Sequence, residues 1–264
     1  MNDRVTVLIP FYNSGCFLKE AIESVFKQTY KKWNVILIDD CSTDKYFDEI
    51  KSYLSDERVT LIKNMKNLGQ SKSLNAGLEL VNTPFVVQLD ADDLFYEDTL
   101  EIMIKEALLQ SEKVGLICGN TTVFQDKKGK KKNIRIKKGS GFKGRYEFLI
   151  ANLSMAPRFY RTTALKEIGG WPTDDPFGGR YREDMRVMYK LIENYHFHWI
   201  DRELYKHRRH NSNLTNNLDK CIEMVEWSIK DTLKRWGDEY EPIFRNTSDG
   251  WKQLHRLKKK KFRQ

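Results

Sequence analysis

Residues 84–93 read Pro-Phe-Val-Val-Gln-Leu-Asp-Ala-Asp-Asp. An apolar, β-branched run that stops at acidic residues is typical of a buried strand that carries polar groups at its carboxyl end. Three further strand-like runs lie upstream, at residues 5–9, 35–38 and 59–62. Between them, residues 18–26 and 71–80 carry apolar side chains at helical spacing. This alternation predicts an α/β fold with right-handed crossovers and a mostly parallel, Rossmann-like sheet flanked by helices.

The rest of the chain is less regular. We expect strands at 114–124 and 133–136 joined by a solvated basic turn at 126–132, and helices at 183–192 and 219–235. Apolar residues make up 40% and charged residues 31% of the 264 positions, which is enough apolar matter for a core and excludes a disordered or collagen-like chain.

The ends of the predicted strands carry the candidate site. Pro10 is expected to end the first strand, Asp39 and Asp40 follow the second, and Asp90-Ala91-Asp92-Asp93 follow the fourth. In open α/β sheets, ligands bind at the carboxyl ends of the strands, so these groups are expected at one edge. Clustered carboxylates there favour a hard divalent cation, Mn²⁺ or Mg²⁺, over the alternative of a capped acidic turn.

Several short stretches together resemble the nucleotide-sugar-binding half of a family 2 inverting glycosyltransferase with the GT-A fold. They are residues 7–13 (Val-Leu-Ile-Pro-Phe-Tyr-Asn), 28–30 (Gln-Thr-Tyr), 38–44 (Ile-Asp-Asp-Cys-Ser-Thr-Asp), 67–69 (Asn-Leu-Gly), 74–77 (Leu-Asn-Ala-Gly) and 89–93 (Leu-Asp-Ala-Asp-Asp). The likeness continues through residues 161–171 and reaches Arg182-Glu183-Asp184, which is similar to the family's Glu-Asp catalytic motif. It implies transfer of a hexosyl or N-acetylhexosaminyl group from a nucleotide diphosphate donor, a UDP-sugar in particular, to an acceptor hydroxyl in one displacement.

The resemblance also implies roles for single residues at the donor's nucleoside. Pro10 and Tyr12 would line the base pocket, and Asp39 would accept a hydrogen bond from a base imide. Asp40 would order the turn at residues 42–44. The further donor-binding positions that it implies are Asn13, Asn67, Gly69, Asn75 and Ala91.

At the diphosphate, Lys72 and the segment from Arg208 to His210 would supply positive charge. Asp90 would bind the ribose or contact the groups that surround the metal, and Asp92 would ligate the metal itself. His210 would contact phosphate or act as a further metal ligand.

On the acceptor side, the resemblance makes Asp184 the general base, with Glu183 beside it. The alternative is that both are acids in the first turn of a helix, where the macrodipole favours them. Trp171 is expected either in the core or against the acceptor.

This interpretation divides the chain into a nucleotide-sugar-binding half at 1–110, an acceptor-binding and catalytic half of the same domain at 111–215, and a helical, basic extension at 216–264. The acceptor would be a glycan, a lipid-linked molecule or a protein, and the C-terminal helices could mediate a homodimer. With no apolar run near the roughly 20 residues of a membrane span and no secretory signal, a cytoplasmic protein is expected. Its C-terminal lysines could contact the inner face of a membrane.

Two other functions use the same features. A sugar-phosphate nucleotidyltransferase also places acids at a parallel sheet edge, but residues 10–15 (Pro-Phe-Tyr-Asn-Ser-Gly) lack its glycine-rich, arginine-containing loop. A non-catalytic basic module for nucleic acid or membrane fits the net charge of +9. The acidic edge opposes that second alternative because carboxylates repel phosphate, so nucleic acid is not expected as a partner.

Overall fold

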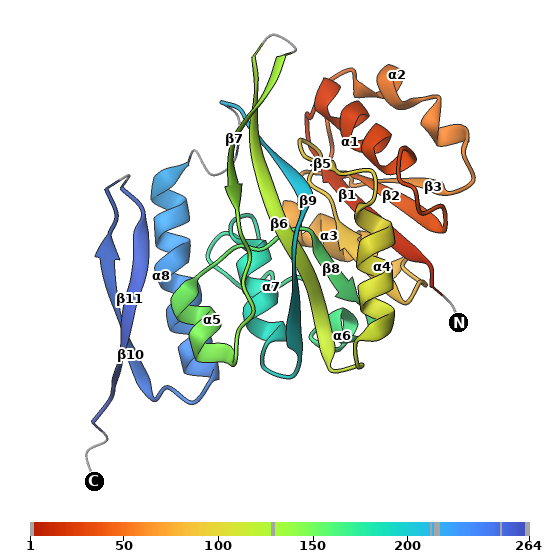
Figure 1. Cartoon of the computed structure of the whole chain (residues 1–264). Coiled ribbons are helices and arrows are strands. Elements are labelled where there is room, and N and C mark those ends of the chain that lie inside the picture. The colour runs from red at the N-terminus through yellow and green to blue at the C-terminus, as the bar shows by residue number, and fades with distance from the viewer. Residues whose placement is uncertain (1–2, 128–129, 212, 214–216, 249, 262–264) are drawn as a thin grey trace.

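The first four strands form the parallel part of the sheet, as the sequence predicts (Figure 1). The computed structural model describes residues 3–127, 130–211, 213, 217–248 and 250–261. The order is β3-β2-β1-β4, with β1 at Val5–Phe11, β2 at Trp33–Asp39, β3 at Val59–Lys63 and β4 at Phe85–Gln88. β1 continues through Pro10, contrary to expectation. β4 pairs with β1 only as far as Leu8. Pro10, which has no N–H to donate, therefore has no partner in β4 whose hydrogen bond it would leave unmade.

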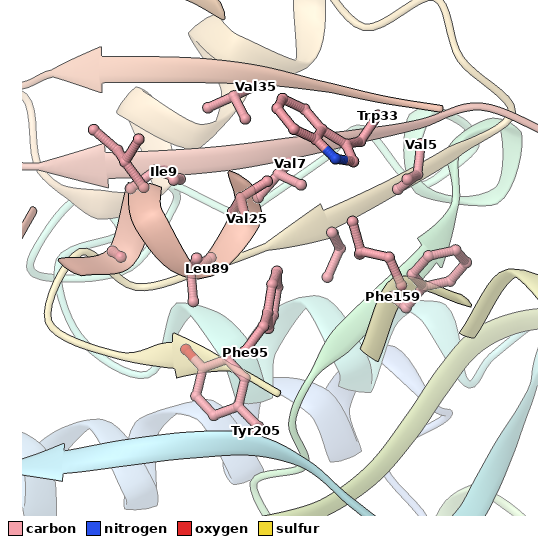
Figure 2. Packing of buried hydrophobic residues seen from close by; sticks show 14 of the residues in the cluster. Val5, Val7, Ile9, Val25, Trp33, Val35, Leu89, Phe95, Phe159 and Tyr205 are labelled. Atoms are coloured by element: carbon pink, nitrogen blue, oxygen red, sulfur yellow. The ribbon is translucent and has the colours of Figure 1, made fainter. Parts of the chain in front are cut away.

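Helices cover both faces of these strands. Val7 and Ile9 of β1 pack in one cluster with Val25 of α1 (Cys16–Phe26), which Figure 2 shows from close by. Leu8 faces the opposite way and packs in a second cluster with Leu74 of α3 (Gln70–Glu79). Burial on both faces explains why these strands are continuously apolar instead of alternating.

The remaining strands make the sheet mixed. β8 (Arg158–Arg161) is antiparallel to both β4 and β6 (Val114–Lys127), whereas β6 and β9 (His196–Arg209) are parallel. β5 (Leu94–Phe95) pairs antiparallel with β9. The α/β class is therefore confirmed, but a parallel arrangement holds mainly for the first four strands.

The predicted hairpin after residue 114 is present as β6 and β7 (Lys130–Lys137), and it projects beyond the rest of the molecule in Figure 1. Residues 128 and 129 of the predicted basic turn lie outside the described residues. The other helices, with the 3₁₀ turn η1, are α2 at Tyr46–Ile50, η1 at Tyr53–Ser55, α4 at Thr99–Leu109, α5 at Arg145–Ala151, α6 at Thr162–Glu167, α7 at Glu183–Leu191 and α8 at Leu218–Arg235. Over the residues that the structure describes, none of the helices is long and apolar enough to cross a membrane.

The C-terminal extension is only partly helical, which corrects the prediction. After α8, the strands β10 (Tyr240–Asn246) and β11 (Lys252–Lys259) form an antiparallel hairpin beside that helix (Figure 1). Gly250 turns the chain with a φ of +83°, and Leu254 of β11 is buried in the second core cluster. Lys258 and Lys259 of the predicted helical, basic extension therefore lie on a strand and not on a helix; the final residues 262–264 are outside the described residues.

Candidate active site

The two acids at the end of β2, Asp39 and Asp40, hold the backbone of the neighbouring loops. Asp39 is buried and accepts hydrogen bonds from the Ser42 backbone N–H at 2.7 Å and the Tyr46 hydroxyl at 2.6 Å. Asp40 accepts hydrogen bonds from the backbone N–H groups of Leu68 and Gly69. Asp40 therefore orders the loop before α3, whereas we expected it to order the turn at 42–44.

That turn is held by Asn13, together with the contact of Asp39 to the Ser42 backbone. The Asn13 side-chain oxygen accepts hydrogen bonds from the backbone N–H groups of Thr43 at 2.7 Å and of Asp44 at 3.2 Å. The backbone N–H of Asn13 donates to the Ser42 hydroxyl. Asn13 has a φ of +50°, a conformation that asparagine tolerates better than most residues. The neighbouring Tyr12 is half exposed, so its ring is free to receive a ligand at the end of β1.

The loop into α3 approaches the segment around residue 180. Arg180 donates hydrogen bonds to the side-chain and backbone oxygens of Asn67. A Cβ on Gly69 would lie 2.7 Å from the Arg180 side chain, so glycine is required there. Lys72 follows on the first turn of α3 and is exposed; among the described residues it makes no ion pair. Its ammonium group is thus available for a ligand.

Asn75 and Trp171 hold two distant segments together. The Asn75 amide donates to the Trp171 carbonyl and accepts from the Trp171 N–H, both at 2.8 Å. The Trp171 ring is 1% exposed and packs against Tyr160. Trp171 is therefore a core residue, and contact of its ring with an acceptor is ruled out in this conformation.

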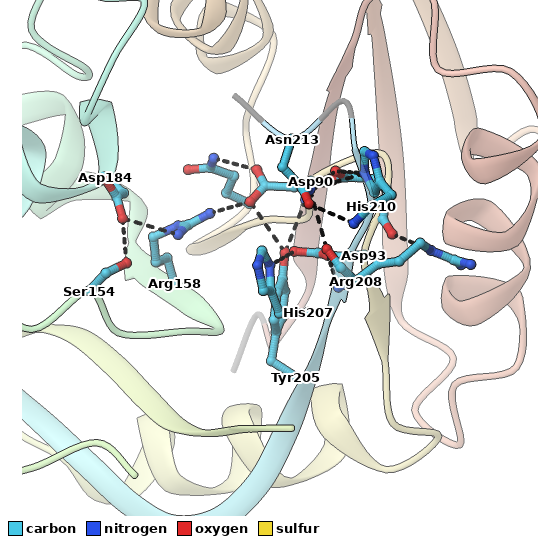
Figure 3. Close-up of polar contacts among 12 residues, drawn as sticks. Asp90, Asp93, Ser154, Arg158, Asp184, Tyr205, His207, Arg208, His210 and Asn213 are labelled. Atoms are coloured by element: carbon cyan, nitrogen blue, oxygen red, sulfur yellow. Dashed lines mark hydrogen bonds and ion pairs between the residues drawn. The ribbon is translucent and has the colours of Figure 1, made fainter. Parts of the chain in front are cut away.

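Asp90 is the centre of a hydrogen-bonded network at the end of β4 (Figure 3). Its carboxylate accepts from the Gln88 amide at 2.9 Å and from Arg158 at 2.8 Å. The Tyr205 hydroxyl accepts the Asp90 N–H at 3.2 Å. The next residue, Ala91, is buried, so only the flanking acids face the site.

Asp92 and His210, the two predicted metal ligands, lie together. The Asp92 carboxylate is 2.7 Å from His210 Nε2, and the Asn213 amide donates to the same oxygen at 3.1 Å. A carboxylate and an imidazole suit Mn²⁺, so these residues fit the implied metal. Within the described residues there is no group of three or more histidine, cysteine or acidic side chains that could hold it. The remaining ligands would have to come from the substrate or solvent. Ser212, Leu214 and Thr215 of this segment lie outside the described residues.

Asp93 faces inward and does not join the metal pair. It is 1% exposed and accepts hydrogen bonds from the Arg208 backbone and from His207. Burial, followed by the negative charge of Asp92, raises the pKa of Asp93 to about 6. Asp93 therefore ties β9 to the segment between β4 and β5.

Arg208 cannot contact the donor, which corrects the prediction for this residue. Its guanidinium is fully buried and bonded to Glu20 and Asp126 at 3.0 Å each, and it stacks against Phe17. Because side chains alternate along β9, the exposed side chain next to it is Arg209.

Glu183 and Asp184 begin α7 and differ in charge state. Burial opposes ionisation of Asp184, but the Arg158 charge at 3.6 Å and the Ser154 hydroxyl outweigh it and lower its pKa. Burial, followed by the charges of Asp184 and Asp90, raises the pKa of Glu183 to about 8. At neutral pH the pair therefore presents one carboxylate, Asp184, and one neutral acid, Glu183.

This difference predicts a pH effect on stability. Between its ordinary pKa of 4.5 and about 8, folded Glu183 keeps a proton that the unfolded chain releases, so stability falls as the pH rises through this window. Glu183→Gln should flatten that slope, and at pH 8 it should raise the melting temperature above that of the parent. Melting curves from pH 5 to 8 check this; parallel pH profiles for the two proteins would show that Glu183 is ionised in the folded state.

The network also contains residues that were not predicted from the sequence, among them Ser154, Arg158 and Tyr205. Arg158 links Asp90 with Asp184, and it is 5% exposed. A signal existed for it, since the arginine interrupts an apolar run at 155–160 (Met-Ala-Pro-Arg-Phe-Tyr), and buried charges are almost always paired. For Ser154 and Tyr205 we find no such signal.

The family follows from comparison with known proteins. Residues 6–169 match the model for glycosyl transferase family 2, and the chain belongs to this family. Over 130 residues it is 27% identical to the glycosyltransferase GlyG of Streptococcus pneumoniae serotype 4, an alignment that covers 49% of this chain and 42% of GlyG. The chain thus aligns with less than half the length of that relative. Membership of this family favours sugar transfer over the two alternative functions named above.

Two solved structures confirm the GT-A fold. S. aureus TarS 1–349 in complex with UDP-GlcNAc aligns with a TM-score of 0.65 and 20% identity, over 86% of this chain and 67% of that chain. The mannosyltransferase PcManGT from Pyrobaculum calidifontis, in complex with GDP-Man and Mn²⁺, aligns with a TM-score of 0.63 and 20% identity, over 88% and 64%. At these identities the likeness concerns the fold alone.

Proposed function

We propose that the protein transfers a sugar from a nucleotide diphosphate donor, a UDP-sugar in particular, to an acceptor hydroxyl with inversion, using a divalent cation and Asp184 as general base. Residues 1–110 would bind the donor and residues 111–215 would complete the acceptor side. The nucleotide sugars bound to TarS and PcManGT support the donor class.

One observation carries this proposal: the short segment Asp90-Ala91-Asp92 takes part in polar contacts at both ends of the site. Asp92 contacts His210 at one end, and at the other Arg158 connects Asp90 to Asp184 (Figure 3). A nucleotide diphosphate at the first end would therefore present its sugar toward a carboxylate at the second.

The charge state of Asp184 suits a base. Arg158 and Ser154 hold it ionised, while Glu183 beside it stays protonated and adds no second negative charge. The Asp184 carboxylate would take the proton of the acceptor hydroxyl as that oxygen attacks the anomeric carbon and the bond to the diphosphate breaks. Because the base and the leaving group act on opposite sides of the sugar, one displacement inverts the configuration.

The remaining residues would bind and orient the donor. Tyr12 would stack on the base beside Pro10 and Asp39, and Lys72 would pair with the diphosphate. Asp92 and His210 would hold the cation, which when bound neutralises charge on the leaving diphosphate. Asn13, Asn67 and Gly69 would shape the loops around the donor.

A thermal-shift screen tests the function. A ligand at about 100 times its dissociation constant stabilises the folded state by about 2.7 kcal/mol, or roughly 5 °C or more for a chain of this size. We expect that shift for UDP with Mn²⁺, a smaller one for UDP with a chelator, and none for uridine. If no nucleoside diphosphate raises the melting temperature with Mn²⁺, the proposed donor class is wrong.

A further inference from the structure

The face of β9 that contacts the active-site acids continues onto the β6–β7 hairpin. Every second position at the end of β9 carries one of Tyr205, His207 and Arg209, so their side chains share one face of the strand. On that face Tyr205 contacts Asp90 and His207 contacts Asp93. Arg209 therefore emerges on the active-site side of the sheet.

Two more cations lie on the same face. In the sheet β6 runs between β9 and β7, so Thr121 stands opposite both Tyr205 and Lys137, and Val123 stands opposite both His207 and Arg135. Directly opposed residues share a face. Arg135 and Lys137 of β7 are therefore aligned with the residues that touch Asp90 and Asp93.

The three cations lie close enough to influence each other. Partial burial of its ammonium group, followed by the charges of Arg135 and Arg209, lowers the pKa of Lys137, while the charges of Asp93 and Asp184 act in the opposite direction. All three residues are exposed, although neighbouring groups partly desolvate the Lys137 ammonium group, and within the described part of the chain none of them makes an ion pair or a side-chain hydrogen bond. The carboxylates of Asp93 and Asp184 offset only part of the repulsion among these like charges, and a bound anion would relieve it further.

We propose that Arg135, Lys137 and Arg209 bind an anionic group of the acceptor, which is a glycan that carries phosphate or carboxylate groups. This inference rests on the proposed function, since it takes Asp184 as the base that meets the acceptor. The donor is expected at the ends of β1, β2 and β4. Arg135 and Lys137 belong to β7, which pairs with β6, and β8 separates β6 from β4 in the sheet. An acceptor held there would place a neighbouring hydroxyl near Asp184.

Matched glycans test this proposal. The probes are end-labelled hexagalacturonate, its carboxyl-reduced neutral counterpart, and a hexamer of glycerol phosphate, with binding measured by fluorescence anisotropy in the presence of UDP and Mn²⁺. The wild-type protein should bind at least one charged hexamer at least about tenfold more tightly than the neutral one, since hydrogen bonds to charged groups are roughly twice as strong as neutral ones. The two charged probes separate carboxylate from phosphate recognition.

The variants locate the site. Arg135→Gln/Lys137→Gln should lose about tenfold or more of the affinity for the charged hexamer and none for the neutral one. The control Lys105→Gln/Lys113→Gln removes the same charge from exposed positions in and after α4 and should bind like the wild type. Equal binding of charged and neutral hexamers by the wild type, or equal losses in both variants, would overturn the proposal.

The nucleotide arm keeps this test separate from the proposed function. UDP binding by Arg135→Gln/Lys137→Gln should equal that of the wild type; a loss of UDP affinity with unchanged glycan binding would assign the cations to the donor and overturn the proposal. Charged-glycan binding without any nucleotide binding in the wild type would contradict the donor proposal and leave the anion site in place.

Discussion

Asp184→Asn is expected to lower the rate of sugar transfer by about a thousandfold while nucleotide binding is retained, because a positioned general base contributes on the order of 10² to 10⁴ in rate. The asparagine is nearly isosteric but cannot take the acceptor proton. Arg158 and Ser154 would still find an oxygen at this position. Transfer is measured by release of the nucleoside diphosphate, and donor binding by calorimetry.

The matched control is Asp48→Asn, which changes an exposed acid of α2. It should leave both transfer and binding unchanged. Turnover of Asp184→Asn within tenfold of the parent would remove Asp184 from the role of base, and a simultaneous loss of nucleotide binding would mean that the substitution disturbs the whole site.

Arg158→Met is expected to destabilise the protein by about 3–5 kcal/mol, since removing one partner of a buried ion pair leaves uncompensated charge. Here two carboxylates, Asp90 and Asp184, would lose their shared cation. Denaturant unfolding measures the loss. Arg161→Met on the same strand serves as the control. Within the described residues the Arg161 side chain donates to two backbone carbonyls at 3.4 Å and lies over the Phe85 ring, and we expect a loss of about 1 kcal/mol or less.

Arg158→Lys distinguishes a positioning role from a purely structural one. Lysine keeps the charge but replaces the fork that spans two carboxylates with a single ammonium. If Arg158 keeps Asp184 ionised, the pKa of Asp184 rises in this variant, and the acid limb of its pH–rate profile moves to higher pH. An unshifted profile would restrict Arg158 to stability.

The sequence predicted the donor half of the fold well because its signals are local. The apolar runs that end at Asp39 and Asp90 are buried on both faces of the sheet, and their ends do meet at one edge. The pair Asp92 and His210, 118 positions apart, was brought together by family resemblance and then found at 2.7 Å. No pattern in the residues alone would have paired them.

The second half was harder to predict because its structure depends on long-range pairing. Strand direction in β6, β8 and β9 has no local signal, so the mixed sheet was missed. Which of Arg208 and Arg209 is accessible to a ligand depends on which face of β9 is buried. That face is determined by Glu20 and Asp126, which come from other elements and pair with Arg208. In the C-terminal hairpin, Leu254 and Leu257 have a helix-like spacing, but the register shift between Ile243 and Phe244 leaves His255 as an extra residue and puts both leucines on one face of β11.

Calorimetric titration of UDP into the wild type and Asp92→Asn, each with Mn²⁺ and with EDTA, tests most directly whether a cation holds the donor diphosphate. We expect the wild type to bind UDP at least about tenfold more tightly with Mn²⁺, and Asp92→Asn to lose most of this difference because the cation loses a carboxylate ligand. A wild-type dissociation constant that is the same with metal and with chelator would contradict a cation-held diphosphate at this sheet edge.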